Sequence, residues 1–145
     1  MLFVLEGSIK NFPKTSDIIL NYENGWLDIN LNNVENRNAL KQNLIRELFI
    51  VFDVIRDNKH VRGVLIRGSN GIFCAGADLK QMKKIASSGT KAKGEAFDLS
   101  MVIGNLLKTI NEAPQVVVSV TEGYAFAGGF GIACASDLIL SLIHI

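Results

Sequence analysis

The stretch that decides the fold is VVVSVTEGYAFAGGFGIACASDLIL, residues Val116–Leu140. It opens with a run of mostly β-branched residues, Val116–Val120, which predicts a strand that is buried on both faces. A turn of small residues follows at Ala127–Gly129, and the apolar residues after it predict a helix that begins near Gly128. The first N–H groups of a helix have no partner within the helix, so a helix start lined with small residues can bind a negatively charged oxygen. We interpret this turn as a candidate anion or oxyanion site.

A second turn of the same kind lies upstream. Val61–Ile66 predicts a short strand, and the small residues Ala75–Ala77 predict a turn that opens a helix at Ala77. A single turn of this kind is explained equally well by close packing of a helix, without any ligand. Two such turns can direct two backbone N–H groups at one point, and a pair of fixed donors stabilises a carbonyl oxygen as it gains negative charge. Together the two turns predict an oxyanion hole.

The preceding part of the chain predicts a hairpin and a helix. Ile18–Tyr22 and Trp26–Leu31 predict two strands that are joined by a glycine turn at Glu23–Gly25. Apolar residues at helical spacing up to Ile55 predict an amphipathic helix that is capped near Asn38. The order of strands and helices along the whole chain predicts an α/β fold with mainly parallel strand pairing.

Between the two turns the sequence predicts a loop and a long helix. Ser87–Lys93 is small, polar and basic, which predicts a mobile loop. The helix after it carries an apolar stripe, and such stripes are expected to be buried core. The stripe consists of Phe97, Met101, Gly104, Leu107 and Ile110.

The composition fits one globular domain. The chain has 145 residues, of which 48% are hydrophobic and 20% charged, and its net charge is +1. This balance favours neither nucleic acid nor a membrane surface as a partner, and no segment resembles a signal peptide or a membrane span, so we expect a cytoplasmic protein. Cys74 and Cys134 have no metal-binding or redox spacing, and we expect both to be reduced packing residues and expect no metal site.

The chain divides into three segments. Residues 1–15 predict a loosely held lead-in, residues 16–140 the domain itself, and residues 141–145 an atypical tail. The last predicted strand, Asp137–Ser141, would leave an exposed sheet edge and an unfinished core. We therefore expect a fold that is truncated before the C-terminal part of its core.

Three motifs carry a resemblance to a known family. GVLIRGSNGIFCAGADLKQM (Gly63–Met82) and PQVVVSVTEGYAFAGGFGIACASDLIL (Pro114–Leu140) resemble the two signature regions of the crotonase, or enoyl-CoA hydratase/isomerase, family. NRNAL (Asn36–Leu40) resembles the first CoA-contacting segment of that family. The resemblance implies a spiral of ββα units that binds an acyl-CoA thioester, with coenzyme A as part of the substrate and no separate cofactor. It also implies a homotrimer or a dimer of trimers for a full-length protein.

The resemblance assigns roles to individual residues. Ala77 and Gly128 stand where family members hold the thioester carbonyl through backbone N–H groups, which agrees with the pairing of the two turns. The positions of the substrate-binding residues fall on Arg37, Ala39, Ala75, Gly76, Asp78, Leu79, Lys80 and Gly129. For Arg37 and Lys80 a role as solvated surface charges is an equal alternative. For Asp78, a cap at the start of its helix is the simplest role.

The sequence departs from the family at the catalytic acids. In hydratases of fatty-acid β-oxidation a glutamate follows the glycine turn, and Gly131 stands at that place here. The second glutamate of the family would lie beyond Ile145. Among nearby carboxylates, Asp137 is expected to cap a turn, and Glu122 is a weaker candidate for catalysis. We expect this chain to be inactive, because neither catalytic glutamate is visible in it and general acid–base catalysis supplies about 10²–10⁴-fold of the rate enhancement.

These features predict an acyl-CoA hydratase that adds water to an α,β-unsaturated thioester through an enolate held by Ala77 and Gly128. The pattern of Glu122-Gly123 and Gly128–Gly131 also resembles hydratases that act on branched isoprenoid acyl-CoAs. Two alternatives remain. One is a family member with a different reaction, such as an aryl- or acyl-CoA dehalogenase or an isomerase, and the other is a fragment that binds acyl-CoA without turning it over.

Overall fold

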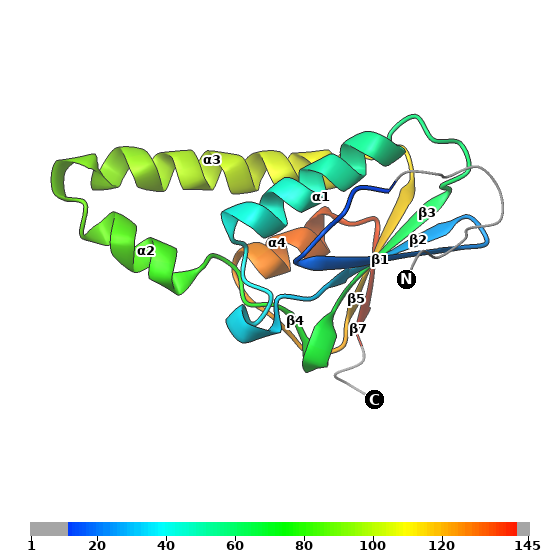
Figure 1. Ribbon diagram of the computed structural model, residues 1–145, viewed down its shortest axis with the longest axis horizontal. Helices are drawn as coiled ribbons and strands as arrows, with labels where there is room; N and C mark the ends of the chain where they lie inside the picture. The colour runs from blue at the N-terminus through cyan, green and yellow to red at the C-terminus, as the bar shows by residue number, and fades with distance from the viewer. Residues whose placement is uncertain (1–11, 142–145) are drawn as a thin grey trace.

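A five-stranded sheet with the strand order β1-β2-β3-β5-β7 organises the computed structural model, which describes residues 12–141 (Figure 1). The lead-in up to residue 11 and the tail after Ser141 lie outside the described residues. A second sheet has two strands, β4 and β6. The strands are β1 (Ile18–Glu23), β2 (Trp26–Leu31), β3 (Gly63–Gly68), β4 (Ile72–Cys74), β5 (Val116–Thr121), β6 (Tyr124–Ala125) and β7 (Leu138–Ser141).

The predicted hairpin is confirmed. β1 and β2 pair antiparallel from Ile18 opposite Leu31 to Glu23 opposite Trp26, and Asn24 and Gly25 both have positive φ, as a tight two-residue hairpin turn requires. All other neighbouring strands of the large sheet pair in parallel. The fold class predicted from the sequence, α/β with mainly parallel pairing, is therefore confirmed.

Four α-helices accompany the sheets within residues 12–141. They are α1 (Gln42–Ile55), α2 (Leu79–Ala86), α3 (Ala92–Asn111) and α4 (Gly128–Ala135). α1 and α4 lie against one face of the large sheet, and α3 lies across both helices (Figure 1). Fully buried side chains of α1, such as Leu44, Leu48 and Ile55, pack in one core with the inward-facing side chains of β2, such as Leu27 and Ile29. The buried strand predicted at Val116–Val120 is confirmed, since all of β5 except Val116 is buried.

Three predicted boundaries are wrong by a few residues. α1 begins at Gln42, not near Asn38, because Asn38 has positive φ and its side chain bonds to other loops. β3 begins at Gly63 instead of Val61. α2 begins after Asp78, whose Oδ1 accepts a hydrogen bond from Gln81 N at 2.8 Å, so Ala77 lies just before the helix.

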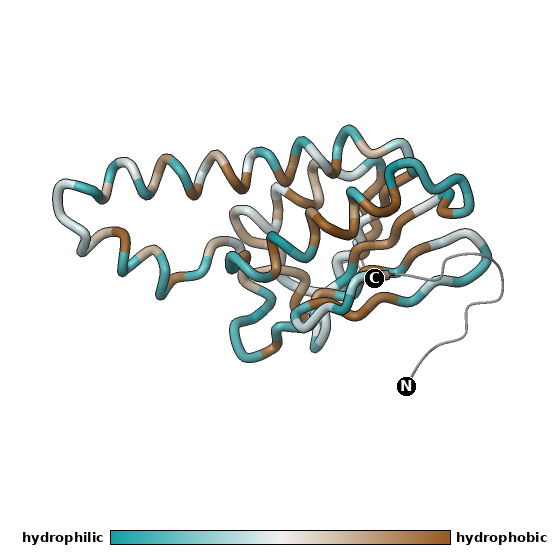
Figure 2. The backbone as a smooth tube through the Cα atoms, turned by 45° about the horizontal axis from the view of Figure 1, so that its top comes forward, coloured by the Kyte–Doolittle hydropathy of each residue, from teal (hydrophilic) through white to brown (hydrophobic). Residues whose placement is uncertain are grey.

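The predictions between α2 and α3 are partly wrong. The segment predicted as a loop, Ser87–Lys93, contains a two-residue turn at Ser87 and Ser88, a short 3-10 helix at Gly89–Lys91 and the first residues of α3. The predicted buried stripe of α3 is buried at Ile110 and half-buried at Leu107, but Gly104 is exposed. Phe97 (63%) and Met101 (48%) are exposed as well, because α2 and the adjoining half of α3 project beyond the sheet (Figure 1). Figure 2 shows that this projecting part alternates between hydrophilic and hydrophobic residues.

The last strand lies at the edge of the large sheet, as predicted. β7 pairs with β5 only, within residues 12–141, and all four of its residues are exposed. Asp137, just before β7, accepts a hydrogen bond from Val117 N at 2.8 Å, so it fastens the end of α4 to β5. Cys74 is buried as expected, but Cys134 is exposed, so its prediction as a packing residue is wrong.

None of the helices within residues 12–141 combines the length and apolarity that crossing a lipid bilayer requires. The same part of the chain brings no three His, Cys, Asp or Glu side chains together in a way that could hold a metal ion.

Candidate functional site

The two predicted turns lie side by side because β4 and β6 pair in parallel. Ile72 is opposite Tyr124 and Cys74 is opposite Ala125, so the two strands end at the same edge of the small sheet. The chain then enters the turn before α2 on one strand and the turn before α4 on the other. Pairing of two very short strands therefore places two helix starts next to each other.

The backbones of the two turns are in direct contact at Gly76. This residue has φ +82°, and a Cβ added to it would lie 2.7 Å from Phe126 O, 3.0 Å from Ala127 Cβ and 3.2 Å from Gly128 N. Only a glycine fits so close an approach at that φ. The structure thus brings the turn that carries Ala77 against the turn that carries Gly128.

Neither predicted donor is used by the fold. Gly128 is the first residue of α4, so its N–H has no partner within the helix. Ala77 lies before the cap of α2, and its N–H likewise precedes the helical hydrogen bonds. Among the hydrogen bonds within residues 12–141, neither the Ala77 N–H nor the Gly128 N–H is a donor. Both amides are available to a ligand.

Ala127, the residue that caps α4, has a strained backbone. Its dihedral angles are φ 45° and ψ −116°, in a region that residues with a Cβ rarely adopt. Such outliers cost about 1–3 kcal/mol each and tend to occur at functional sites. The ψ angle of Ala127 sets the orientation of the peptide that carries the Gly128 N–H. The strain therefore supports the view that the direction of this N–H has a function.

Replacing Ala127 with glycine is expected to raise the free energy of unfolding by about 1 kcal/mol. The change relieves about 1–3 kcal/mol of strain and adds about 0.5–1 kcal/mol of backbone entropy in the unfolded chain. Urea denaturation measures the difference. Ala133→Gly, at a buried helical position of α4, is the matched control and is expected to lower the stability. Equal losses in both variants would contradict strain at Ala127.

A third segment, residues 37–40, bonds to the turn before α2, and its Leu40 side chain packs beside Gly128 of the other turn. The amide of Leu40 donates to Gly76 O at 2.7 Å, and the amide of Ala75 donates to Arg37 O at 3.1 Å. Asn38 holds this segment in place: its side chain is fully buried, accepts from Asn33 N at 2.9 Å and donates to Ile72 O at 2.8 Å. The sequence analysis missed this role and interpreted Asn38 as a helix cap, although an Asn within a polar turn is also a signal for positive φ.

A pocket of about 430 Å³ opens beside these segments. Its lining comes from the loop before α1 and from the turn before α2. The lining residues are Glu35, Asn36, Arg37, Ala39, Ala75, Ala77, Asp78, Leu79 and Lys80. The structure thus brings together every predicted substrate-binding residue except Gly76 and Gly129. It adds Asn36, the first residue of the NRNAL motif, and Glu35, which precedes that motif.

Three of the four charged residues of this pocket, Glu35, Arg37 and Lys80, are exposed and form its rim, and the fourth, Asp78, is buried. Arg37 and Lys80 are both exposed and both line the pocket, so the two roles considered for them are compatible. Asp78 is buried, caps α2 and lies 3.9 Å from Lys41 Nζ, which confirms the cap predicted for it. The two rim cations suit a ligand that carries negative charge outside an apolar part.

A second pocket, of about 410 Å³, shares Arg37 and Ala75 with the first. Its other walls are Ile72, Tyr124 and Phe126. The rings of Tyr124 and Phe126 stack with centroids 5.5 Å apart and an angle of 10° between their planes, and both are exposed. The sequence analysis missed this aromatic wall, because two residues of a two-residue strand give no periodic signal.

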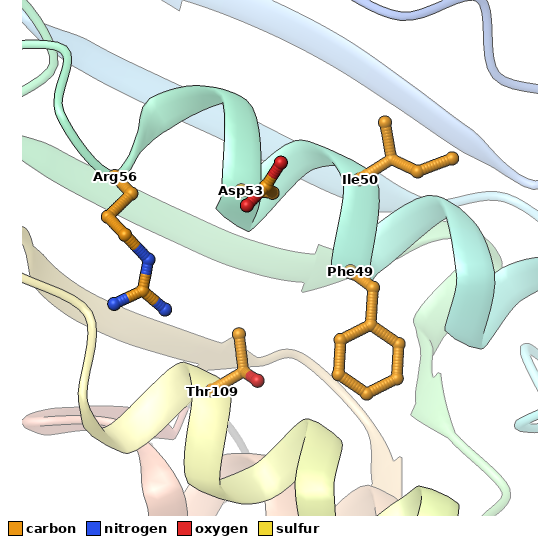
Figure 3. A pocket seen from close by; sticks show the side chains of 5 residues that line it. All are labelled: Phe49, Ile50, Asp53, Arg56 and Thr109. Atoms are coloured by element: carbon orange, nitrogen blue, oxygen red, sulfur yellow. The ribbon is translucent and has the colours of Figure 1, made fainter.

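A third pocket lies elsewhere. It has a volume of about 340 Å³ and is lined by Phe49, Ile50, Asp53, Arg56 and Thr109. Figure 3 shows these five side chains between α1 and α3. This pocket shares no residue with the predicted site. We place the candidate site at the two helix turns, because there the unused N–H groups of two adjoining turns lie beside a pocket.

Gly129 has a packing contact in this structure. It is buried, its N–H donates to Phe126 O at 2.8 Å, and a Cβ at this position would meet the carbonyl oxygen and side chain of Cys74. Its assignment as a substrate contact stays a prediction.

Burial raises the pKa of the Cys74 thiol to about 11, although the hydrogen bond from the Gly76 amide opposes this effect. Cys74 is therefore a neutral thiol near pH 7. Glu122, the weaker candidate for a catalytic acid, is exposed and acts electrostatically on Asp28 of β2. The pKa of Asp28 is raised, mainly by burial and further by Glu122, while Arg67 at 3.3 Å lowers it. Glu122 thus belongs to this charged group on the sheet and not to the lining of the two pockets beside the turns.

Comparison with known proteins gives consistent results. The sequence model of the family described as "Enoyl-CoA hydratase/isomerase" matches residues 21–141. The chain is 34% identical to methylglutaconyl-CoA hydratase, mitochondrial, from Mus musculus over 115 residues, which is 79% of this chain and 35% of that protein. It is 29% identical to ethylmalonyl-CoA decarboxylase from Mus musculus over 132 residues, which is 91% of this chain and 39% of that protein.

Among solved structures, Pseudomonas aeruginosa AtuE superposes with a TM-score of 0.79 at 36% identity, over 87% of this chain and 48% of that chain. The chain thus spans about a third of the length of the curated relatives that it matches and about half the length of the solved structures.

Proposed function

Because this chain belongs to the enoyl-CoA hydratase/isomerase (crotonase) family, we propose that it binds an acyl-CoA thioester and holds the thioester carbonyl between the N–H groups of Ala77 and Gly128. The observation that carries this proposal is the contact between the two turns at Gly76, with both N–H groups unused by the fold. Two fixed donors at one oxygen favour a carbonyl that gains negative charge, and the protein pays no reorganisation cost when the charge develops.

The pocket beside the turns suits the coenzyme A part of such a ligand. The apolar residues of its lining, including Ala39 and Leu79, offer contacts to an uncharged chain, and Arg37 and Lys80 at the rim offer contacts to phosphates. Coenzyme A enters as part of the substrate, and the proposal requires no other cofactor.

The reaction that we propose for the whole protein is hydration of an α,β-unsaturated acyl-CoA. A general base would take a proton from water as the water oxygen bonds to the β-carbon, and the electrons of the double bond would pass to the thioester oxygen. A general acid would then give a proton to the α-carbon as the thioester carbonyl re-forms. Ala77 and Gly128 would stabilise the enolate between these steps. Gly131 has no side chain, Asp137 bonds to the Val117 amide and Glu122 lies beside Asp28, so we assign the general acid and base to none of these three residues. The narrower proposal, a hydratase similar to isohexenylglutaconyl-CoA hydratase, rests on the pattern around the glycine turn alone.

An enolate held by two donors also serves other reactions. One relative is named a decarboxylase, and loss of carbon dioxide from a carboxylated acyl-CoA leaves the same enolate. Dehalogenation, isomerisation and binding without turnover are the remaining alternatives. The oligomer, a trimer or a dimer of trimers, is a proposal for the full-length protein. Cytoplasmic location stays a prediction, and the name of one curated relative places that relative in mitochondria.

Titration calorimetry tests the carbonyl contact directly. We expect an acyl-CoA thioester to bind about 5- to 150-fold more tightly than the matching thioether, which lacks the carbonyl oxygen, because two hydrogen bonds are worth about 1–3 kcal/mol. The thioether serves as the matched control, since it keeps coenzyme A and the acyl chain. Free coenzyme A reports the contribution of the pocket alone. Equal affinities for the thioester and the thioether would overturn the proposed role of the two N–H groups.

A further inference from the structure

Cys74 lies at the end of β4, immediately before the turn that carries Ala77. Its side chain is fully buried, and its Sγ accepts a hydrogen bond from Gly76 N at 3.4 Å. A side-chain acceptor that bonds to the backbone N–H two residues ahead fixes a turn in the way that Asp, Asn and Ser side chains do in loops. The Cys74 side chain thus fixes the peptide between Ala75 and Gly76.

The next peptide, between Gly76 and Ala77, is held at its other end. Leu40 N donates to Gly76 O at 2.7 Å. In a planar trans peptide the C=O and the following N–H point in opposite directions, so this bond also sets the direction of the Ala77 N–H. The two peptides flank the Cα of Gly76, and a glycine permits a wider range of φ and ψ than other residues. Both peptides must therefore be held for their directions to be fixed. The bonds from Gly76 N to Cys74 and from Leu40 to Gly76 O together fix the direction of the Ala77 donor.

Cys74 also contacts the second turn. Its carbonyl oxygen accepts from Phe126 N at 3.0 Å, and a Cβ added at Gly129 would lie 2.7 Å from the Cys74 Cβ. The residue that bonds to the Ala77 turn is therefore packed against the start of α4. A displacement of Cys74 would change the distance between the two donors.

We propose that Cys74 is a positioning residue for the thioester carbonyl: its Sγ holds the Gly76 amide and thereby directs the Ala77 N–H toward the point that the Gly128 N–H also reaches. This inference rests on the proposed function, since it assumes that the two N–H groups bind the carbonyl. Cys74 acts through Gly76 and does not itself contact the ligand.

The test compares Cys74→Ala with Cys74→Ser, by calorimetry with an acyl-CoA thioester and its thioether. The two replacements have similar volumes, but only serine keeps an acceptor that can bond to the Gly76 amide. We expect Cys74→Ala to lower the preference for the thioester by roughly 2- to 12-fold, the value of one hydrogen bond, while its affinity for the thioether stays unchanged. Cys74→Ser is expected to retain most of the preference.

A purely structural role for Cys74 would give another result. It would weaken the binding of both ligands together and would affect serine and alanine alike, and this outcome would overturn the proposal. An alanine variant with the preference of the wild type would overturn it as well. Absence of the preference in the wild type would instead refute the proposed function, so the two failures are distinguishable.

Hydrogen exchange of the unaltered chain covers the case in which Cys74→Ala does not fold. We expect the Gly76 amide to be protected and the Ala77 amide to become protected only when the thioester is bound. Exchange of the Gly76 amide at the rate of an open loop would overturn the proposal.

Discussion

Replacing Gly128 with proline is expected to remove most of the preference for an acyl-CoA thioester over the matching thioether. Proline deletes the N–H that we propose as the second donor, and the first position of a helix is where proline is best tolerated. The loss in ground-state binding is expected to be about 0.5–1.5 kcal/mol, or roughly 2- to 12-fold in Kd. In a protein with turnover, loss of one such donor is expected to cost about 10²–10³-fold in kcat.

Gly128→Ala is the matched control for this change. It adds a Cβ at the same place, 2.7 Å from Leu40 Cδ1, which is the end of a flexible side chain, and it keeps the N–H. We expect alanine to retain the preference that proline removes. Proline restricts the backbone of the residue before it, and Ala127 is already strained, so distortion of the turn could by itself lower the preference in the proline variant. Replacing the amide of residue 128 with an ester therefore provides a second variant, which deletes the N–H without introducing a proline ring. Wild-type preference in the ester variant would refute the role of Gly128.

Gly129→Ala is expected to lower the free energy of unfolding by about 2–3 kcal/mol and to abolish the preference for the thioester. The added Cβ would meet the carbonyl oxygen of Cys74 and would lie 2.7 Å from its Cβ and 2.9 Å from its carbonyl carbon. These atoms belong to the backbone and the first side-chain atom of β4, so they cannot move aside without separating α4 from β4. Denaturant unfolding and the calorimetric pair of ligands measure the two effects.

Two other glycines serve as controls for Gly129→Ala. A Cβ at Gly131, in the same helix, would lie 2.9 Å from Leu107 Cδ1, which is the end of a flexible side chain. A Cβ at Gly104 in α3 would meet nothing within 4 Å. Gly104→Ala is expected to stabilise the chain by up to about 1 kcal/mol through helix propensity alone, and Gly131→Ala is expected to cost little. Losses of similar size in all three variants would show that close contact with Cys74 is not the cause.

The parts of the fold that could be predicted from the sequence are those with a local signal. The hairpin followed from Glu23–Gly25 between two apolar runs, and the helix start at Gly128 followed from small residues after a β-branched run. The proximity of the two turns was expected from their similarity, but its cause was not. It results from pairing of β4 with β6, and strands of three and two residues are too short to give a periodic pattern.

The errors have physical causes as well. Phe97 and Met101 recur at helical spacing, but periodicity shows only that one face is apolar and not that another element covers it. Asn38 was interpreted as a cap because asparagine is common at helix starts. Its buried amide instead bonds to Asn33, earlier in the same loop, and to Ile72 of β4, which is remote in the sequence. The backbone outlier at Ala127 could not be predicted, since a small alanine between Phe126 and Gly128 suggests no strain.

Pairing of Ile72 with Tyr124 has a further consequence for the order of folding. The two residues are far apart along the chain, with α2, α3 and β5 between them, so their pairing closes a long loop and is entropically costly until those elements have formed. The two helix starts are then expected to meet only at a late stage of folding. A ligand that bridges them binds the completed chain and not its partly folded forms, so by mass action it would slow unfolding as well as raise stability.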